Sequence, residues 1–302
     1  MELSYKQVIK ACRVPAGRRV RLKDYDPGWT SAIEGKNGDA ILVKERAEAL
    51  LEVNRRELAK AQELLWASDS RAVLLVFQAL DAAGKDGVIK HVMSGVNPQG
   101  CQVFAFKTPS DEELDHHFMW RYSSRVPERG RIGIFNRSYY EEVLVVRVHP
   151  EFLERQRLPP GKRDKSFWKA RYDDINAFEK HLVTNGTVVL KFLLNVSKKE
   201  QKRRFLERLE NPDKNWKFSS ADIAERAHWD EYQEAFSDML SATSTEWAPW
   251  HVVPADHKFM TRAIVSTIVA TSIRELGLEH PEPDEAQKAV IAAARRKLLA
   301  ER

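Results

Sequence analysis

The stretch RAVLLVFQALDAAGKDGVIKH, residues 71–91, joins an apolar strand to a helix through a turn that contains glycine. Short apolar runs such as AVLLVF are typical of strands that are buried on both faces. The turn after this run matches the pattern [AG]xxxxGK at Ala79, Gly84 and Lys85. A turn of this kind points backbone N–H groups and the positive end of a helix at an anion, so the stretch predicts a phosphate-binding loop.

Two carboxylates distinguish this loop from the common pattern. Asp86 follows Lys85, where a Ser or Thr hydroxyl ordinarily completes a magnesium site. Asp81 lies inside the loop, where it would repel phosphate unless a metal ion or a basic side chain lies between them. We therefore expect Asp81 to bind Mg²⁺, and the alternative is a plain strand-to-helix turn with a solvated Lys85. The residues expected to contact phosphate here are Ala82, Ala83, Gly84, Asp86 and Gly87.

Short apolar runs alternate with helical patterns along most of the chain. The predicted strands cover residues 71–77, 101–106, 131–135, 187–194 and 250–254. Residues 40–66 repeat apolar side chains at intervals of three and four, which predicts an amphipathic helix. Such alternation indicates βαβ units, which form a parallel sheet with helices on both faces. We therefore predict an α/β fold around a parallel five-stranded sheet.

The third predicted strand ends at Asn136 and Arg137, and ligands of parallel sheets gather at the carboxyl ends of strands. Asn136 takes the place of an acidic Walker B residue and has no charge. More of the negative charge that binds the metal must therefore come from Asp81 and from the substrate phosphates. The planar guanidinium of Arg137 suits a transferring phosphoryl group, and an ion pair with Glu141 or Glu142 is the alternative. Glu141 comes four residues after Arg137, so the two would share a face of a helix starting near Ser138. Glu141 is therefore a candidate contact for an acceptor's base or ribose.

Basic residues concentrate in residues 198–217, between the fourth and fifth predicted strands. Arg204 and Arg208 fall on one face of a predicted helix, and Lys214 and Lys217 follow in a loop. A helical pair at this place in the fold can act as a lid, and so many cations predict a strongly anionic substrate. A solvated basic helix is the alternative.

Length and composition indicate one folded domain with peripheral segments. The chain has 302 residues, of which 43% are apolar and 31% are charged, enough for a sizeable core. We divide it into an N-terminal arm (1–40), a domain at 41–277 that includes the lid at about 198–245, and a C-terminal helical tail (278–302). The arm is rich in Gly, Pro and basic residues, so we expect it to be loosely structured.

Other features of the sequence restrict the function further. The longest apolar runs are far below the ~20 residues that span a bilayer, and the start lacks an apolar signal core, so we expect a cytoplasmic protein that binds no membrane. Cys12 and Cys101 have no CxxC partner and are expected to be reduced thiols. His116 and His117 are expected at a helix flank, in a structural or solvated role. The net charge of +5 slightly favours anionic partners.

Several segments taken together resemble the type-2 polyphosphate kinases. They include QALDAAGKDGVIKHVMSGVNPQG, VPERGRIGIFNRSYYEEVLVVRVHP, NPDKNWKFSSAD and WHVVPADHK, and the resemblance runs from about residue 40 to residue 277. It implies a three-layer α/β/α P-loop kinase fold with a helical lid, and Mg²⁺-dependent phosphoryl transfer between inorganic polyphosphate and a nucleotide. The run NRSYYE, which contains Asn136 and Glu141, is similar to the class III form, whose members use both AMP and ADP as acceptors.

The resemblance also implies roles for single residues. Asp81, Lys85, Asn136 and Arg137 match positions of the family's catalytic motifs, and Glu141 stands where the subgroups differ. The resemblance also implies that three residues of the lid bind phosphate: Arg208, Lys214 and Lys217. The expected reaction is attack by the terminal phosphate of AMP or ADP on the end of polyphosphate, which forms ADP or ATP. Mg²⁺ is the expected cofactor, a homo-oligomer (dimer or tetramer) is the expected assembly, and nucleic acid is not an expected partner.

Two other functions are compatible with parts of this pattern. A nucleoside or small-molecule kinase that uses ATP would need the loop and the lid, but it does not account for the missing Ser or Thr after Lys85 or for the cationic lid. A non-catalytic binder of polyanions or nucleic acid would use the same basic segment, but it does not need a tight phosphate turn.

Overall fold

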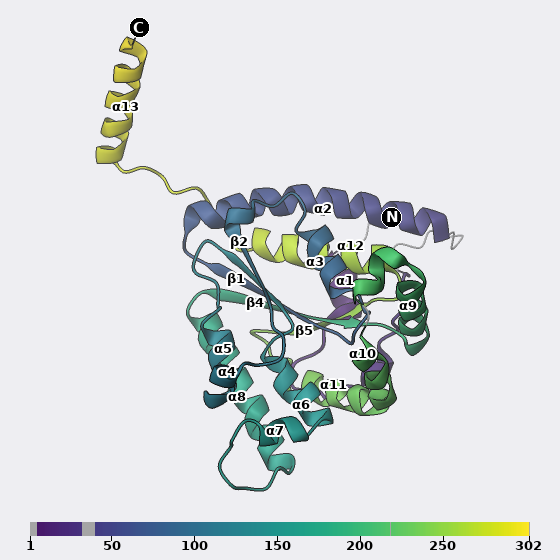
Figure 1. Cartoon of the computed structure of the whole chain (residues 1–302). Helices are drawn as coiled ribbons and strands as arrows, with labels where there is room; N and C mark the ends of the chain where they lie inside the picture. The colour runs from purple at the N-terminus through teal and green to yellow at the C-terminus, as the bar shows by residue number, and fades with distance from the viewer. Residues whose placement is uncertain (1–4, 32–39, 218, 302) are drawn as a thin grey trace.

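The centre of the molecule is a parallel sheet of five strands (Figure 1). The computed structural model describes residues 5–31, 40–217 and 219–301, except for the side chains of Lys214 and Lys217. The strands are β1 (Ala72–Gln78), β2 (Cys101–Ala105), β3 (Ile132–Asn136), β4 (Thr187–Asn195) and β5 (Trp250–Pro254). Their order across the sheet is β2-β3-β1-β4-β5, and each neighbouring pair is parallel. All five lie where the sequence predicts them, and the α/β fold class is confirmed.

Helices cover both faces of the sheet and complete three layers (Figure 1). One face carries α1 (Tyr5–Cys12), α2 (Ala40–Ser68), α3 (Lys85–Val92) and α12 (Lys258–Arg274). The opposite face carries α5 (Trp120–Ser123), α8 (Lys165–Thr184) and α11 (Trp229–Thr243). In β1, Val73, Leu75 and Phe77 pack toward the first set of helices, whereas Leu74 and Val76 pack toward the second. The two-residue alternation of a strand therefore supplies both halves of the core.

The long helix predicted from periodicity is confirmed as α2. Its buried side chains include Val43, Ala47, Leu51, Leu58 and Leu65, which recur every four or seven residues and so share one face. This face packs on α12, which lies between α2 and the sheet (Figure 1). Because α12 is covered on both sides, twelve of its residues are buried, and its sequence is apolar or small around most of the helix.

Between β4 and β5 the chain leaves the sheet and forms the helices of the predicted lid. They are α9 (Lys198–Glu210), η4 (Pro212–Lys217), α10 (Ser220–Glu225) and η5 (Arg226–His228), after which α11 returns to the sheet. The side chain of Ser197 caps α9 by accepting a hydrogen bond from the N–H of Glu200 at 3.1 Å. We use the name lid segment for residues 198–228. Figure 1 shows it beside the end of the sheet where α3 begins.

Residues 5–31 are not a loosely structured arm, and that prediction is wrong. The N–H of Val14 donates a hydrogen bond to the carbonyl of Trp250 in β5 at 2.8 Å, and the N–H of Leu22 donates to Ser237 Oγ at 2.9 Å. Both Val14 and Leu22 are buried. Gly and Pro mark turns in this segment, but the apolar residues between them pack into the core of the domain. Residues 1–4 and 32–39 of the predicted arm lie outside the described residues, and Ala40 begins α2.

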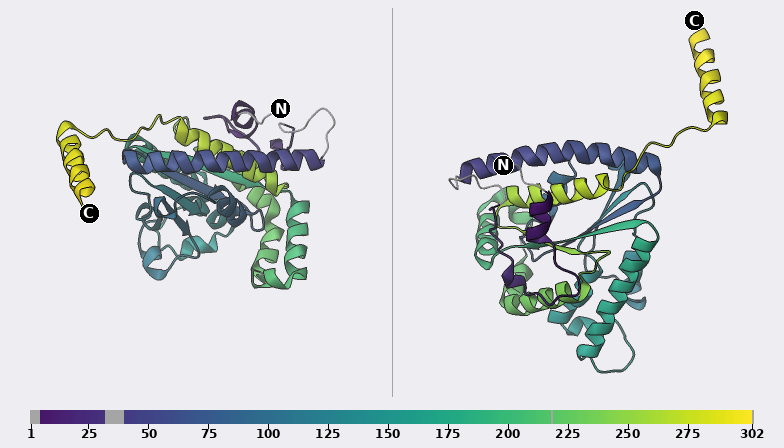
Figure 2. Two further views of the ribbon diagram at one scale, coloured as in Figure 1. Left: turned by 90° about the horizontal axis from the view of Figure 1, so that it is seen from above. Right: turned by 180° about the vertical axis from the view of Figure 1, so that it is seen from behind.

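The C-terminal segment contains the expected helix, α13 (Glu285–Ala300). A capping box begins it, in which Asp284 and Gln287 bond each other's backbone N–H groups. The whole helix is exposed and projects from the body of the molecule (Figure 2). In the described part of the chain, no helix is both long enough and apolar enough to cross a membrane. The division into arm, domain and tail stays a prediction.

Candidate active site

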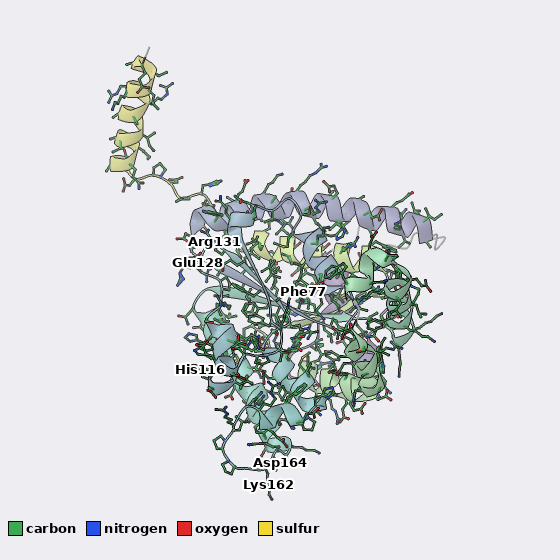
Figure 3. All side chains as sticks on the ribbon, in the orientation of Figure 1. Phe77, His116, Glu128, Arg131, Lys162 and Asp164 are labelled. Atoms are coloured by element: carbon green, nitrogen blue, oxygen red, sulfur yellow. The ribbon has the colours of Figure 1, made fainter. Side chains whose placement is uncertain are left out.

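The phosphate loop and the end of the third strand meet at one edge of the sheet. β1 and β3 are neighbours, and Phe77 is paired with Asn136 in their register. The strand order reverses at β1, because β2 and β3 lie on one side of it and β4 and β5 on the other. Ligands of open α/β sheets bind at such a point. Phe77, labelled in Figure 3, marks the carboxyl end of β1, where the loop begins.

Two left-handed residues give the loop its tight shape. Gly84 has a φ of 106°, which glycine tolerates and other residues rarely adopt. Ala82 has a φ of 62°, in the small left-handed region that non-glycine residues seldom occupy. The chain then enters α3, whose first N–H groups and dipole attract anions. The geometry supports the predicted phosphate contacts of Ala82, Ala83, Gly84 and Gly87, which stay predictions.

Lys85, the first residue of α3, folds back over the loop. Its Nζ donates a hydrogen bond to the carbonyl of Ala79 at 2.7 Å, and the residue is only 9% exposed. Burial lowers the pKa of the Lys85 ammonium, and the nearby carboxylate of Asp81 opposes this shift. A phosphate bound in the loop would therefore meet a positive charge that is already desolvated.

Arg137 links the end of β3 to the carboxylate inside the loop. Its NH2 lies 2.9 Å from Oδ1 of Asp81, and its NH1 lies 3.9 Å from Oε2 of Glu141. Arg137 has a φ of 65°, and its N–H donates a hydrogen bond to the carbonyl of Phe77 at 3.1 Å. Glu141 above all, and then Asp81, raises the pKa of Arg137. The guanidinium is thus fixed between the phosphate loop and the turn after β3.

Asn136 is turned toward α3. Its Nδ2 donates a hydrogen bond to Oδ1 of Asp86 at 2.8 Å. This bond ties β3 to the first turn of α3, where a negative side chain is favoured by the helix dipole. The role of Asn136 in the chemistry and the contact of Asp86 with phosphate stay predictions.

Glu141 lies in a short 3-10 helix, η3 (Tyr139–Val143), so a helix does start near Ser138, but Arg137 lies outside it. The left-handed backbone of Arg137 takes the chain sharply out of β3, and Ser138 is extended and caps η3 with its hydroxyl. Glu141 still reaches Arg137, but through this turn and not along a helix face. Burial raises the pKa of Glu141, and the charge of Arg137 opposes the shift.

A depression of about 680 Å³, open to solvent, lies beside Arg137 and Glu141. Its wall comes from the loop after β2, from α5, and from two short helices, α6 (Val145–Val148) and α7 (Glu151–Glu154). Both apolar side chains and cations line it: Phe106, Tyr122, Val145, Phe152, Lys107, Arg121 and Arg155. A flat apolar surface next to positive charge can hold a heterocyclic base together with a phosphate.

Glu142 supports the floor of this depression and does not pair with Arg137. Its Oε2 accepts hydrogen bonds from Arg171 NH1 at 2.9 Å and from Gln156 Nε2 at 2.7 Å. Glu142 and Arg171 are both buried. Of the two ion pairs considered for Arg137, only the one with Glu141 is formed among the described residues.

A fully buried polar network lies under η3. Oε1 of Glu179 accepts hydrogen bonds from the hydroxyls of Tyr139 at 2.9 Å and Tyr140 at 2.8 Å. Lys191 Nζ donates to Oε2 of Glu179 at 2.6 Å, to the hydroxyl of Tyr140 at 2.8 Å and to the carbonyl of Thr243 at 2.7 Å. The network fixes η3 and therefore the site residues on either side of it. This network was not predicted from the sequence, although the lone charge within the apolar run TVVLKFLLNV is a visible signal of it.

Arg204 is buried, and neither the solvated alternative nor a phosphate-facing lid side chain describes it. Its Nε pairs with Glu200 at 2.8 Å. Its NH1 donates to the carbonyls of Ala82 at 3.1 Å and Ala83 at 2.7 Å, and its NH2 donates to the carbonyl of Ala255 at 2.5 Å. All three nitrogens of the guanidinium are therefore hydrogen-bonded to other protein groups. Arg204 joins the lid segment to the back of the phosphate loop.

Arg208, one turn further along α9, faces α10. Its NH1 lies 3.2 Å from Oδ2 of Asp222. Burial raises the pKa of Asp222, and the charge of Asp81 adds to the shift. Asp222 was not predicted from the sequence. The side chains of Lys214 and Lys217, which the sequence also assigns to phosphate, lie outside the described residues.

The residues at the loop fit a magnesium ion that binds together with phosphate. Within the ranges that the structure describes, no three His, Cys, Asp or Glu side chains form a metal cluster. Mg²⁺ commonly takes one or two carboxylates and completes its six ligands with substrate phosphates and water. Asp81 meets this need, because Arg137 bonds Oδ1 and the carboxylate has a second oxygen.

The two neighbouring histidines lie away from this site. His116 follows α4 (Asp111–Asp115), and its ring stacks on Trp120 with centroids 4.1 Å apart. Both His116 and His117 are exposed, and Figure 3 shows His116 at the periphery, apart from Phe77. The structural or solvated role predicted for His116 is confirmed.

Comparison with known proteins identifies the family. Residues 41–281 match the family described as polyphosphate kinase 2. The chain is 53% identical over 257 residues to the ADP-polyphosphate phosphotransferase of Rhodopseudomonas palustris, covering 85% of this chain and 89% of that protein. It is 43% identical over 283 residues to the AMP/ADP-polyphosphate phosphotransferase of Meiothermus ruber, covering 94% and 99%. The crystal structure of polyphosphate kinase 2 from Arthrobacter aurescens aligns with a TM-score of 0.83 at 40% identity, over 95% of this chain and 96% of that one. The match spans every residue of the site described above, and the chain belongs to the polyphosphate kinase 2 family.

Proposed function

We propose that this enzyme transfers the terminal phosphoryl group of inorganic polyphosphate to AMP and to ADP, forming ADP and ATP. The observation that carries the proposal is the position of Arg137, between Asp81 of the phosphate loop and Glu141 at the depression. One guanidinium thus lies between a site for bare phosphate and a site that can hold a nucleoside. The names of the relatives from Rhodopseudomonas palustris and Meiothermus ruber support the same reaction.

The donor end of polyphosphate binds, in this proposal, to the phosphate loop. The N–H groups of the loop and of the first turn of α3 bond its oxygens, and Lys85 neutralises charge on the terminal group. Arg208, Lys214 and Lys217 of the lid segment bind phosphates further along the polymer. A chain of linked phosphates has no base to recognise, so charge and hydrogen-bond donors account for its binding.

The acceptor binds in the depression beside Glu141. Its base lies against the aromatic and aliphatic wall, and its phosphate points to Arg137. Glu141 contacts the ribose or the base, because it is the carboxylate that reaches both the depression and Arg137. ADP has one more phosphate than AMP, so its nucleoside stands further from the phosphate loop when the terminal phosphates occupy the same place. An open depression suits both acceptors.

The reaction is a direct displacement between the two substrates. An oxygen of the acceptor's terminal phosphate attacks the terminal phosphorus of polyphosphate, and a new P–O bond forms. The bond from that phosphorus to the bridging oxygen breaks, and the shortened polyphosphate leaves with the electron pair. Arg137 and Lys85 stabilise the charge on the transferring group, and positioning with charge neutralisation supplies most of the rate in reactions of this type.

Asp81 would hold Mg²⁺ as the cofactor, which neutralises phosphate charge when it is bound. Arg137 keeps Asp81 oriented toward the phosphate side of the loop before substrate binds. The cytoplasmic location and the dimer or tetramer stay predictions that follow from the sequence and the family.

Incubation of the purified protein with radiolabelled AMP, polyphosphate and Mg²⁺, without ATP, tests the function. We expect labelled ADP and then labelled ATP, and we expect Lys85→Ala to abolish both. If the label stays in AMP, and ADP supplied as the acceptor is also left unchanged, the proposed function is wrong. If ATP is the only donor that works, the enzyme is an ordinary nucleotide kinase.

A further inference from the structure

One buried amide connects the lid segment to the phosphate loop. Gln201 lies in α9 and is only 3% exposed. Its Nε2 donates a hydrogen bond to the carbonyl of Asp81 at 2.9 Å. Its Oε1 accepts a hydrogen bond from NH1 of Arg226, at the start of η5. The two ends of a single side chain therefore hold two elements that are distant in sequence.

The bond to Asp81 belongs to a row of contacts that orient the loop. Gln201 binds the carbonyl of Asp81, and Arg204 binds those of Ala82 and Ala83, so three successive carbonyls face α9. The described peptide bonds are trans, and the C=O of one residue points opposite to the N–H of the next. The N–H groups of Ala82 and Gly84 are thereby directed away from α9, toward the phosphate side. The backbone donors of the loop depend on α9 for their direction.

Arg226 is the outer end of this connection. It contacts the loop through Gln201, and its guanidinium also lies 3.4 Å from the carbonyl of Lys198 at the start of α9. The residue before it, Glu225, accepts a hydrogen bond from Tyr232 in α11 at 2.8 Å and one from His149 at 3.0 Å. Arg226 is thus part of the outer lid segment, α10 and η5, which is bonded through Glu225 to α11 and to His149, the residue after α6.

We propose that Gln201 is a positioning residue for the donor site: it transmits the placement of the outer lid segment, through Arg226, to the carbonyl of Asp81. When Arg226 holds the amide oxygen, the amide nitrogen is held toward the loop, because the two groups belong to one planar amide. When Arg226 moves away, Gln201 can rotate, and the loop loses one of the bonds that direct its N–H groups. The inference rests on the proposed function, since it concerns how that site holds polyphosphate.

This mechanism makes a different prediction from simple charge attraction by the lid segment. If positive charge alone mattered, removing any exposed cation from α9 or η5 would weaken polyphosphate binding by a similar factor. If Gln201 transmits the position of Arg226, substitution of Arg226 weakens polyphosphate binding only while Gln201 is present. Lys202 is the matched control, since it is an exposed cation adjacent to Gln201 in α9.

The experiment compares Arg226→Gln, Gln201→Leu, the double variant and Lys202→Gln in the full-length protein. The readouts are the polyphosphate Kd by calorimetry, the KM values for polyphosphate and AMP, and kcat. For Arg226→Gln we expect the KM and Kd for polyphosphate to rise about three- to tenfold, the factor that one net hydrogen bond corresponds to. We expect the KM for AMP and kcat at saturating polyphosphate to stay within a factor of about two. The double variant should match Gln201→Leu alone.

Two results would overturn the inference. One is an equal effect of Arg226→Gln and Lys202→Gln on the KM for polyphosphate, and the other is full additivity of the Arg226 and Gln201 substitutions. If Gln201→Leu does not fold, Gln201→Glu replaces it, because a carboxylate keeps the partner of Arg226 and loses the donor to Asp81. Wild-type protein that transfers nothing from polyphosphate would instead contradict the proposed function itself.

Discussion

NH2 of Arg137 lies 2.9 Å from Oδ1 of Asp81, and this contact joins the left-handed residue after β3 to the middle of the phosphate loop. Two parallel neighbouring strands bring the side chains together, although 56 positions separate them in the chain. The pair keeps opposite charges at the point where a phosphoryl group would be transferred. Its disruption should therefore affect the chemical step more than the fold.

Substitution of Arg137 by lysine tests the fork geometry of the guanidinium. Lysine keeps the charge but cannot bond Asp81 and a phosphoryl oxygen in parallel, so we expect kcat to fall by a factor of about 10³. Initial rates of ADP formation from AMP and polyphosphate measure the effect. Arg203→Lys, an exposed substitution in α9, is the control and should stay near the wild-type rate. An Arg137→Lys enzyme within threefold of wild type would remove Arg137 from the mechanism.

Glu141→Asn tests the acceptor site. AMP must place its nucleoside one phosphate nearer to the loop than ADP does, so it depends more on the side chain between Arg137 and the depression. We expect AMP-dependent transfer to fall by about tenfold or more, with ADP-dependent transfer retained within a factor of about three. Separate assays with each acceptor give the ratio, and Glu234→Gln on the exposed face of α11 is the control. Equal loss with both acceptors would count against the assignment.

The buried pair of Lys191 and Glu179 should be required for stability. Both side chains are fully buried, and burial lowers the pKa of Lys191 while Glu179 opposes the shift. Lys191→Met leaves the carboxylate without its cation and should reduce the free energy of unfolding by about 3–5 kcal/mol. Chemical denaturation measures this loss. The double variant Lys191→Met, Glu179→Leu should lose less than the sum of the single variants, and strict additivity would show that the two side chains act independently.

The contribution of Glu200 to the free energy of unfolding should depend on pH in a known direction. Hydrogen bonds from Arg203, and then from Arg204, lower the pKa of Glu200 from its ordinary value of 4.5 to about 2. Its stabilising contribution is therefore complete above pH 4.5 and is lost as the pH falls toward 2. At neutral pH, Glu200→Gln should reduce the free energy of unfolding by about 1–2 kcal/mol, and the deficit relative to wild type should shrink below about pH 4. Glu285→Gln, in an exposed pair of α13, should show no such trend. A deficit that is constant with pH would contradict the role of the charge.

Much of the fold can be predicted from local sequence. The strands of a buried parallel sheet are short apolar runs, and α2 has a regular apolar face. Both can therefore be recognised from residues that are close together in the sequence. The packing of residues 5–31 cannot be found in this way, because Val14 bonds to Trp250 at the other end of the chain. The 3-10 geometry of η3 was missed because it depends on the left-handed backbone of Arg137, which the residue type does not disclose.

The site also contains residues that the sequence predicts and residues that it does not. Asp81 and Lys85 lie in the loop and helix that follow β1, Asn136 and Arg137 lie at the end of β3, and the topology of a parallel sheet brings such positions together. Gln201 and Arg204 lie in α9 and contact the loop only because the lid segment folds back against it. A pattern of basic residues predicts a cationic surface, but it does not distinguish a guanidinium that bonds backbone carbonyls, as that of Arg204 does, from one that is free to bind phosphate.

The most direct test of the central claim is a crystal structure of the protein with a short polyphosphate and Mg²⁺. We predict that the terminal phosphoryl group lies at the loop, bonded by N–H groups next to Gly84 and by Lys85, with Arg137 beside it and the polymer running along the lid segment. A polymer bound elsewhere on the surface, with the loop at Gly84 free of phosphate in a crystal that retains transfer activity, would contradict the account.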